Sequence, residues 1–325
     1  MKLPKKSWKY LLPLLVIVFC ALSINTRLAF RQKPDQSSHI DSVDLNHEEP
    51  GSSSDEMEVS EVSMEKEKAL KARLFSIISG DDADYSIYVL FPSWSIPLVE
   101  NNQQQSSASI IKIFILSTAY EMAERGELDL DEKICVRRKD MVGGAGVLNA
   151  RSGEPMLSVR ELLQLMITES DNTATNVLID HLTFSRIQNH CEAHGFTNTI
   201  LRRKMMDIGA MRAGYDNLTT VEDVGEWMRC LRNRQLVSPS ADASMEQTLF
   251  AQMDTECFPC ALPQASIAHK TGELTGVYHD AGIIYENNKS YVLVIFSSKS
   301  VDRHKTLSTM RQMAKIVNEY FLSDN

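Results

Sequence analysis

The sequence predicts an α+β fold: an antiparallel sheet formed by both chain ends, flanked by helices, with an all-helical inserted subdomain. Three observations support this fold class. Runs rich in β-branched and aromatic residues lie at 85–99 and again at 265–297. Between them, apolar residues recur with helical spacing, and two further helical segments begin and end the domain. Strands from both ends therefore have to meet in one sheet, with the intervening helices packed beside it.

The helices follow from the spacing of apolar residues and from their end signals. Leu70, Leu74 and Ile77 share one face of the first segment. Gly126 ends the strongly apolar second segment, and Ser158 with Glu161 forms a capping-box pattern at the start of the third. The expected helices cover 65–78, 109–124, 158–167, 173–182, 219–230 and 305–321.

The strands follow from short apolar runs bounded by turn residues. The expected strands cover 85–91, 95–99, 265–270, 278–285 and 291–297. Pro97 has no amide proton to donate to a neighbouring strand, so the second run is expected at a sheet edge or a bulge.

Composition and charge limit the domain organisation and the classes of partner. The chain has 325 residues, 43% of them hydrophobic, which fits one large domain with an appendage. Its net charge of −9 argues against nucleic acid as a partner, because phosphate binding needs a basic surface. We expect a signal or anchor segment at 1–30, a disordered acidic linker at 31–64 and a globular domain at 65–325.

The first segment indicates export. Four lysines between residues 2 and 9 precede the uncharged run from Tyr10 to Ile24. This run suits either an uncleaved membrane anchor or a signal peptide removed after Ala21-Leu22-Ser23, so the rest of the chain is expected outside the cytoplasm, anchored or secreted. No aromatic residue occurs between 31 and 64, and a stretch without aromatic residues is typical of a solvated tether.

Three short motifs carry the chemistry. They are Ser-x-x-Lys at 109–112, Ser-Asp-Asn at 170–172 and Lys-Thr-Gly at 270–272. Ser109 and Lys112 are one helical turn apart and share a helix face. The second motif lies on a connection between helices, and the third begins in a strand. Each motif alone is common, but the ordered triple supplies the parts of a serine acyl-transfer site.

The region from about Met64 to the C-terminus resembles the class A β-lactamases and the related D-peptidases. The resemblance rests on the three motifs and on the stretches 142–148 and 163–176, which surround the second motif. It is most similar to class A, and it implies the fold expected above.

The resemblance also implies roles in acylation. Ser109 is the nucleophile, and Lys112 takes its proton if burial and the nearby Lys270 depress the lysine pKa. Ser170 relays a proton to the leaving nitrogen. The backbone N–H groups of Ser109 and Glu273 form the oxyanion hole.

The remaining motif residues are expected to bind substrate. Asn172 holds the side-chain amide of the substrate. Lys270 and Thr271, followed by Gly272, bind the carboxylate that penicillins, cephalosporins and D-alanyl peptides share.

The loop between the second and third motifs departs from the class A pattern. Those enzymes have an E-x-x-x-N motif there, which activates the deacylating water. In this chain Met205 falls where the glutamate belongs and Gly209 where the asparagine belongs. Asp207 is the one carboxylate in that window, and two roles are open for it: a substitute base, or an ion pair with Arg202 or Arg203 that holds the loop.

The leading interpretation is a serine β-lactamase that opens the β-lactam ring through an acyl-enzyme on Ser109. A D,D-peptidase acting on peptidoglycan stem peptides would use the same nucleophile, and the missing glutamate favours it. A β-lactam sensor is a third alternative, although the nine residues before Tyr10 are short for a cytoplasmic output. The expected substrate is a β-lactam or D-alanyl peptide, with no cofactor.

Two other patterns do not predict a metal site. His190 and His194 share a helix face but lack the H-E-x-x-H pattern, so they are expected to be surface histidines. Cys257 and Cys260 form a lone C-x-x-C without a second pair, which argues against a zinc site. An oxidising compartment permits disulfides among the five cysteines after residue 30, with at least one left unpaired and the connectivity left open. Arg303 follows the last strand and is either an added charge at the carboxylate site or a solvated loop residue.

Overall fold

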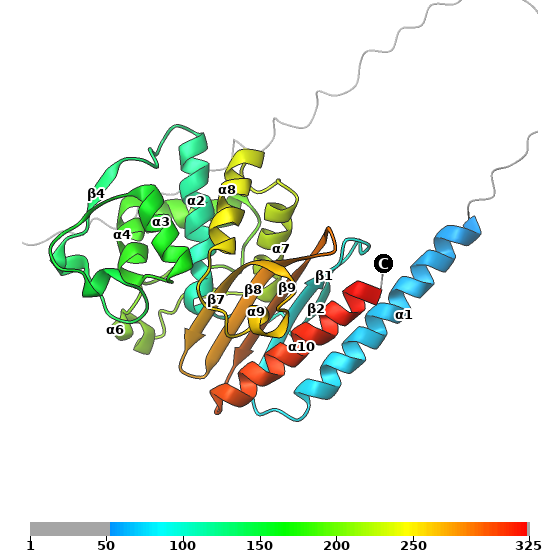
Figure 1. The fold of residues 1–325 in the computed structure, drawn as a ribbon. Helices are drawn as coiled ribbons and strands as arrows, with labels where there is room; N and C mark the ends of the chain where they lie inside the picture. Colours follow the sequence, from blue (N-terminus) through cyan, green and yellow to red (C-terminus); the bar gives the residue numbers. More distant parts are fainter. Residues whose placement is uncertain (1–52, 324–325) are drawn as a thin grey trace, which may run out of the picture. The chain divides into compact units, whose positions relative to one another are not determined.

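A five-stranded antiparallel sheet organises the domain, as predicted from the two chain ends. The computed structural model describes residues 53–323, and their side chains from residue 65 onward. The strand order is β2-β1-β9-β8-β7 (Figure 1). The strands are β1 (Asp84–Leu90), β2 (Leu98–Glu100), β7 (Ser266–Leu274), β8 (Val277–Glu286) and β9 (Lys289–Ser298).

Both faces of the sheet are covered, and the central strand shows this by alternation. Val292 and Val294 of β9 belong to the core that packs against the helical part of the molecule. Leu293 and Ile295 belong to a second core on the opposite face. Even-numbered residues of β9 therefore point to one face and odd-numbered residues to the other, because successive side chains alternate across a strand.

The second core lies under the two terminal helices. These are α1 (Ser53–Ile78) and α10 (Arg303–Ser323), which contact each other and run side by side along one face of the sheet (Figure 1). Leu70 and Leu74 of α1 and Met310 and Val317 of α10 are almost fully buried there. The short helix α9 (Phe258–Ala261) closes the same face.

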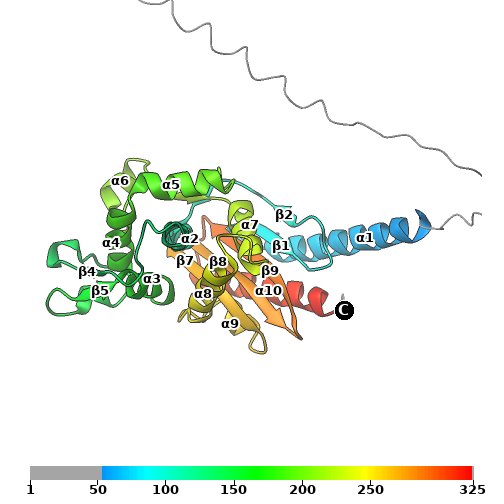
Figure 2. The same ribbon diagram turned by 90° about the horizontal axis from the view of Figure 1, so that it is seen from above.

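The opposite face carries the inserted helical region. Its central helix, α2, is seen nearly end-on in Figure 2, with α5 lying across it. The α-helices of this region are α2 (Lys112–Glu124), α3 (Val159–Thr168), α4 (Asn172–Leu182), α5 (Phe184–Ala193), α6 (Ile208–Arg212), α7 (Val221–Arg232) and α8 (Pro239–Phe250). Three 3-10 turns, η1 (Ala108–Ile111), η2 (Arg138–Asp140) and η3 (Leu148–Ala150), and two small sheets complete it. The small sheets pair β3 (Gln105–Ser106) with β6 (Leu218–Thr219) and β4 (Lys133–Cys135) with β5 (Met156–Ser158).

Local sequence signals explain several boundaries. The capping box predicted at Ser158 and Glu161 is confirmed, since both reciprocal hydrogen bonds are present. Thr220 caps α7 by accepting the N–H of Asp223. Gly126 ends α2 with φ +71°, a left-handed conformation that glycine adopts without strain.

Some predicted boundaries are wrong. The linker was expected to reach Met64, but α1 begins at Ser53, because no proline or glycine lies between Gly51 and Gly80 and the segment is rich in helix formers. The strand expected at 95–99 is reduced to β2, which starts immediately after Pro97 and lies at the sheet edge. The third predicted strand extends beyond Lys270, so that the whole Lys-Thr-Gly motif lies on β7.

Two further predictions concern the N-terminal segment and the disulfides. The expected signal or anchor segment lies outside the described residues. Among the helices of residues 53–323, none is long and apolar enough to cross a bilayer. The five cysteines in the described part of the chain, including Cys257 and Cys260, are all free, so none of the disulfides that an oxidising compartment permits is present among them.

Candidate active site

Ser109 and Lys112 lie at the start of the central helix, where it packs against the sheet. Ser109 is on η1, and Lys112 is the first residue of α2. In a 3-10 turn, residues i and i+3 lie over one another. The Lys112 Nζ is accordingly 3.0 Å from Ser109 Oγ. The lysine side chain is fully buried, whereas Ser109 is partly exposed. The site therefore has a reachable hydroxyl backed by a buried amine.

The Ser-Asp-Asn motif meets the same lysine from the other side. Lys112 Nζ lies 2.7 Å from Ser170 O, 3.0 Å from Ser170 Oγ and 3.1 Å from Asn172 Oδ1. Ser170 connects α3 to α4 with φ +52°, a conformation uncommon for a residue with a side chain. This turn directs both the carbonyl and the hydroxyl of Ser170 at Lys112.

Asp171 holds this turn in place. Its carboxylate accepts the N–H of Ala174 and caps α4, and it also accepts the N–H groups of Val147 and Leu148. Gly146 has φ +108°, and a Cβ there would lie 2.3 Å from the Asp171 carboxylate. Asp171 was not predicted as a site residue, although an aspartate directly before a helical run is a recognisable capping signal.

The Lys-Thr-Gly motif completes the cluster from β7. Lys270 is fully buried, with Nζ 3.1 Å from Ser170 Oγ and 2.7 Å from Thr271 O. A Cβ at Gly272 would lie 3.2 Å from the backbone N of Ser109, so glycine lets β7 approach η1 closely. Glu273 is the next residue of β7, which is an edge strand of the sheet and contacts η1.

The hydrogen-bond partners of Lys112 fit a neutral amine. Two of its partners, Ser170 O and Asn172 Oδ1, can only accept hydrogen bonds. A neutral amine has two N–H groups for these two oxygens and one lone pair, which can accept the hydroxyl proton of Ser109. An ammonium would have no lone pair for that proton. The contacts therefore match a lysine that acts as a base.

Electrostatics favour the same protonation states. Burial, and next the charge of Lys270, hold the pKa of Lys112 well below its ordinary value, and Asp171 opposes them in part. Burial lowers the pKa of Lys270 to about 8, while Asp254 and Asp280 limit the fall. The pKa of about 8 leaves Lys270 mostly charged near neutral pH, and the lowered pKa of Lys112 favours its neutral form, so the two lysines suit anion binding and proton transfer respectively.

The first and last residues of the loop from Arg203 to Asp216 form an ion pair that holds its two ends together. Arg203 Nη2 lies 2.7 Å from Asp216 Oδ1, and the arginine side chain is only 6% exposed. Asn217 accepts the N–H of Arg203 at 2.9 Å. The ion pair with Arg202 or Arg203, one of the two roles left open for Asp207, is therefore wrong: Arg203 is bound to Asp216, and within residues 65–323 no ion pair joins Asp207 to Arg202.

Asp207 has a different partner. Its Oδ1 accepts the N–H of Ala210 at 2.9 Å and so caps α6. It is exposed, and within residues 65–323 no hydrogen bond or ion pair links it to Ser109 or Lys112. A role for Asp207 as the deacylating base stays a prediction.

Two methionines occupy the part of the loop nearest the motifs. Asn176, one turn along α4 from Asn172, donates to Met205 O at 3.0 Å and accepts the Met205 N–H at 2.7 Å. This clamp fixes residue 205 beside α4, with its side chain 7% exposed. A Cβ at Gly144 would lie 2.9 Å from Met206 Sδ and 2.6 Å from Asn172 Nδ2, so both side chains lie beside Gly144. No local pattern predicts the Asn176 clamp, since its partners are 29 residues apart.

Arg303 is the first residue of α10 and not a loop residue, while its role as an added charge at the carboxylate site stays a prediction. Its guanidinium donates to both carboxylate oxygens of Glu273 at 3.0 Å and also pairs with Glu256. Arg303 therefore ties the start of α10 to β7. The histidines set aside as surface residues also need correction, because His190 is only 4% exposed.

The comparisons with known proteins agree with this geometry. A family model described as the β-lactamase enzyme family matches residues 68–321. The chain belongs to this family. Its curated relatives include the extended-spectrum β-lactamase PER-1 from Pseudomonas aeruginosa, 22% identical over 252 residues that cover 73% of this chain and 82% of the relative.

Solved structures share the fold of this family member. One is a β-lactamase from Sphaerobacter thermophilus, with a TM-score of 0.72 and 23% identity over 78% of this chain and 97% of that chain. Another is a leucine-to-glutamate variant of PBP-A, an acyl-enzyme complex with penicillin G. It has a TM-score of 0.73 and 24% identity over 79% of this chain and 97% of that one. The predicted α+β architecture is confirmed by these likenesses.

Proposed function

We propose that this chain is a serine β-lactamase that opens the β-lactam ring through an acyl-enzyme on Ser109. The observation that carries the proposal concerns the buried Lys112 Nζ. It lies 3.0 Å from Ser109 Oγ and donates hydrogen bonds to two oxygens that can only accept them, Ser170 O and Asn172 Oδ1. Membership of the β-lactamase family supports the substrate class.

Acylation uses the cluster in a definite order. Ser109 Oγ attacks the lactam carbonyl carbon while its proton passes to the Lys112 lone pair. The backbone N–H groups of Ser109 and Glu273 are assigned to the oxyanion. The carbon–nitrogen bond then breaks, and the nitrogen takes a proton from the Ser170 hydroxyl. Lys112 returns its proton to Ser170 and becomes neutral again.

Substrate binding uses the remaining motif residues. The ammonium of Lys270 and the hydroxyl of Thr271, on the strand that Gly272 brings close to η1, are assigned to the substrate carboxylate. The Asn172 amide, which also donates to Gly143 O at 3.2 Å, is assigned to the substrate side chain.

Peptide mapping after incubation with penicillin G tests this function. We expect one adduct per chain, located on Ser109, and no adduct in Ser109→Ala. Ser95→Ala changes an exposed serine before β2 and serves as the control that retains labelling. An adduct on another residue, or none in the folded wild type, would refute the proposal.

A D,D-peptidase is the second candidate, favoured by Met205 at the loop position where a glutamate base is expected and by Gly209 where the asparagine is expected. It would release D-alanine from a stem peptide ending in D-Ala-D-Ala and would stay acylated by penicillin. Chromatographic detection of released D-alanine, absent in Ser109→Ala, would favour the peptidase over the lactamase.

We also propose that the domain works outside the cytoplasm, held to the membrane by the segment before residue 31 or secreted after its cleavage. The support is the basic and then uncharged run that ends at Ile24. N-terminal sequencing and membrane fractionation of the full chain distinguish the two forms. Exported chain that hydrolyses penicillin should raise bacterial resistance to it, and Ser109→Ala should not; full-length chain in the cytosol would contradict the proposal.

A further inference from the structure

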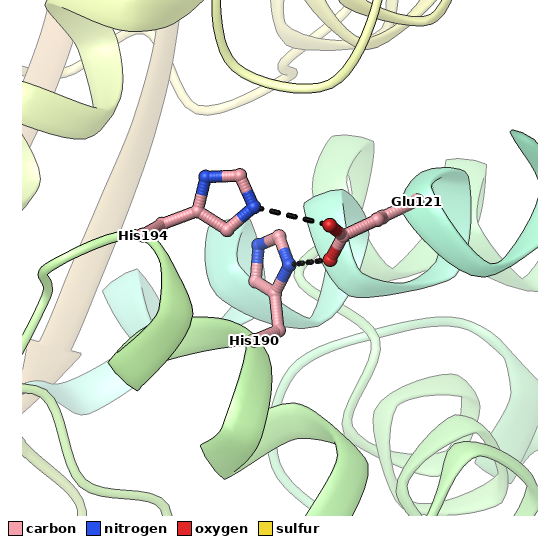
Figure 3. Close-up of side chains that lie close together, drawn as sticks. All are labelled: Glu121, His190 and His194. Atoms are coloured by element: carbon pink, nitrogen blue, oxygen red, sulfur yellow. Dashed lines mark hydrogen bonds and ion pairs between the residues drawn. The ribbon is translucent and has the colours of Figure 1, made fainter. Parts of the chain in front are cut away.

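Three potential metal ligands gather on the helix that carries Lys112, away from the acyl-transfer cluster. Glu121 is on α2, while His190 is on α5 and His194 follows the end of α5 (Figure 3). One ligand atom from each lies within 4.8 Å of the other two. His190 Nδ1 pairs with one Glu121 oxygen, and His194 Nε2 lies 3.3 Å from the other. Nine residues separate Lys112 from Glu121, about 13 Å along a helix.

The inner histidine is held by partners that suit a metal ligand. His190 Nε2 lies 2.7 Å from Ser117 Oγ, and Trp227 Nε1 donates to the same oxygen at 3.0 Å. Ser117 Oγ is also 3.2 Å from Phe114 O. Metal-binding histidines usually donate their second N–H to such a neighbour, which fixes the ring. All the side chains in this outer network are buried.

The same network serves the empty and the filled site. Without metal, the Ser117 hydroxyl donates to His190 Nε2, and His190 Nδ1–H donates to Glu121. With metal, Nδ1 gives its lone pair to the ion and Nε2 carries the proton. Ser117 then accepts from both His190 and Trp227 and donates to Phe114 O. Every buried polar atom keeps a partner in both states.

We propose that Glu121, His190 and His194 bind one zinc-class divalent cation, with water at the remaining position, and that this ion ties α5 to α2. Two imidazole nitrogens and one carboxylate oxygen are ligands that Zn²⁺ accepts. Ligands about 2 Å from a tetrahedral ion are roughly 3.3 Å apart, so ligand atoms that now lie up to 4.8 Å apart need to move closer by at most about 1.5 Å. His194 can supply it, because its side chain is 24% exposed and lies at a helix end.

Arg125 is the group that opposes the ion. Its guanidinium donates to Glu121 Oε1 at 2.6 Å, and its side chain is 60% exposed. A bound cation would compete with this exposed pair for the carboxylate. Removing the arginine charge is therefore expected to strengthen metal binding, an effect opposite to that of removing a ligand.

Zinc titration of the chelator-treated full chain tests the proposal, by calorimetry and by the visible spectrum of the Co²⁺ form. We expect one Zn²⁺ per chain in the wild type, with a rise in Tm. His194→Ala should weaken binding by about tenfold or more, and Arg125→Ala should strengthen it severalfold.

His181→Ala is the matched control, since His181 is also a half-exposed histidine paired with a glutamate, Glu132 at 2.7 Å. It should bind zinc as the wild type does. No stoichiometric zinc binding by the wild type, or equal losses in His181→Ala and His194→Ala, would overturn the proposal. His194→Asn, similar in polarity, replaces His194→Ala if that variant lacks a cooperative thermal transition. Penicillin labelling of Ser109 is scored separately, so either proposal can fail alone.

Discussion

The serine–lysine cluster and the loop from Arg203 to Asp216 are both well anchored, but they differ in the chemistry of the side chains they hold. In the cluster, Lys112 and Lys270 are fully buried, and each is bound to oxygens on rigid elements. The loop is equally well anchored, by the Arg203–Asp216 ion pair and the Asn176 clamp. The side chains that this anchoring presents, however, are those of methionines.

The difference separates two halves of one reaction. Acylation needs a nucleophile, a base and an anion anchor, and the cluster has all three. Hydrolysis of the acyl-enzyme needs in addition a positioned water and a base, and a methionine thioether cannot take a proton. The loop is therefore anchored but has no carboxylate at residue 205, and we expect fast acylation followed by slow deacylation.

Removing the proposed base should have the largest effect. Lys112→Ala is expected to slow acylation by about 10²–10⁴-fold, with non-covalent binding preserved, because general-base catalysis contributes that much. Lys270→Ala is the contrasting variant and should weaken binding as well, since it removes a charge assigned to the substrate carboxylate. Stopped-flow acylation at several penicillin concentrations separates rate from affinity. If both variants lost affinity alone, the assigned roles would be wrong.

Restoring a carboxylate to the loop should have the next largest effect. Met205→Glu is expected to shorten the acyl-enzyme lifetime by about 10–100-fold, below the full range for a base because the carboxylate is added to a buried position. Met205→Gln has the same size but no basic group and is the control. Intact-mass spectrometry after removal of free penicillin measures both lifetimes. Equal lifetimes for the two variants would show that residue 205 does not face the ester.

The pH dependence of acylation should reflect the two lysines. Acylation needs Lys270 charged, and its pKa is lowered to about 8. The second-order rate constant should therefore fall above about pH 8, approaching tenfold for each further pH unit. In Lys270→Arg this alkaline fall should move to higher pH, because a guanidinium keeps its proton. An unchanged profile in that variant would assign the fall to another group.

The smallest effect is expected at Asp207. Asn caps a helix about as well as Asp, so Asp207→Asn should keep α6 and leave the acyl-enzyme lifetime unchanged. Lengthening by tenfold or more, measured by the same mass spectrometry, would instead show that the carboxylate turns toward the ester and acts as the base.

The same two regions show what the sequence could predict. The helices, the sheet from both chain ends and the three motifs depend on short-range patterns, such as the capping box at Ser158 and the Ser109–Lys112 spacing. That Lys112 and Lys270 both contact Ser170 could be expected only through the family resemblance, since Ser170 and Lys270 are 100 residues apart in the sequence.

Partner choice in the loop and on α2 was not predictable in this way. Arg203 had several acids within reach in the sequence, and the folded backbone selects Asp216. Likewise, His190 is buried because α5 lies across α2, which places it against Glu121 and Ser117. Such contacts are set by tertiary packing and leave no local pattern.

A stopped-flow record of a chromogenic cephalosporin tests the central claim most directly. The account predicts a burst of roughly one opened ring per chain, as Ser109 is acylated, followed by a much slower steady phase set by deacylation. Ser109→Ala should show neither phase. Linear turnover from the first cycle at hundreds per second, within the usual enzyme range and without a burst, would contradict the account.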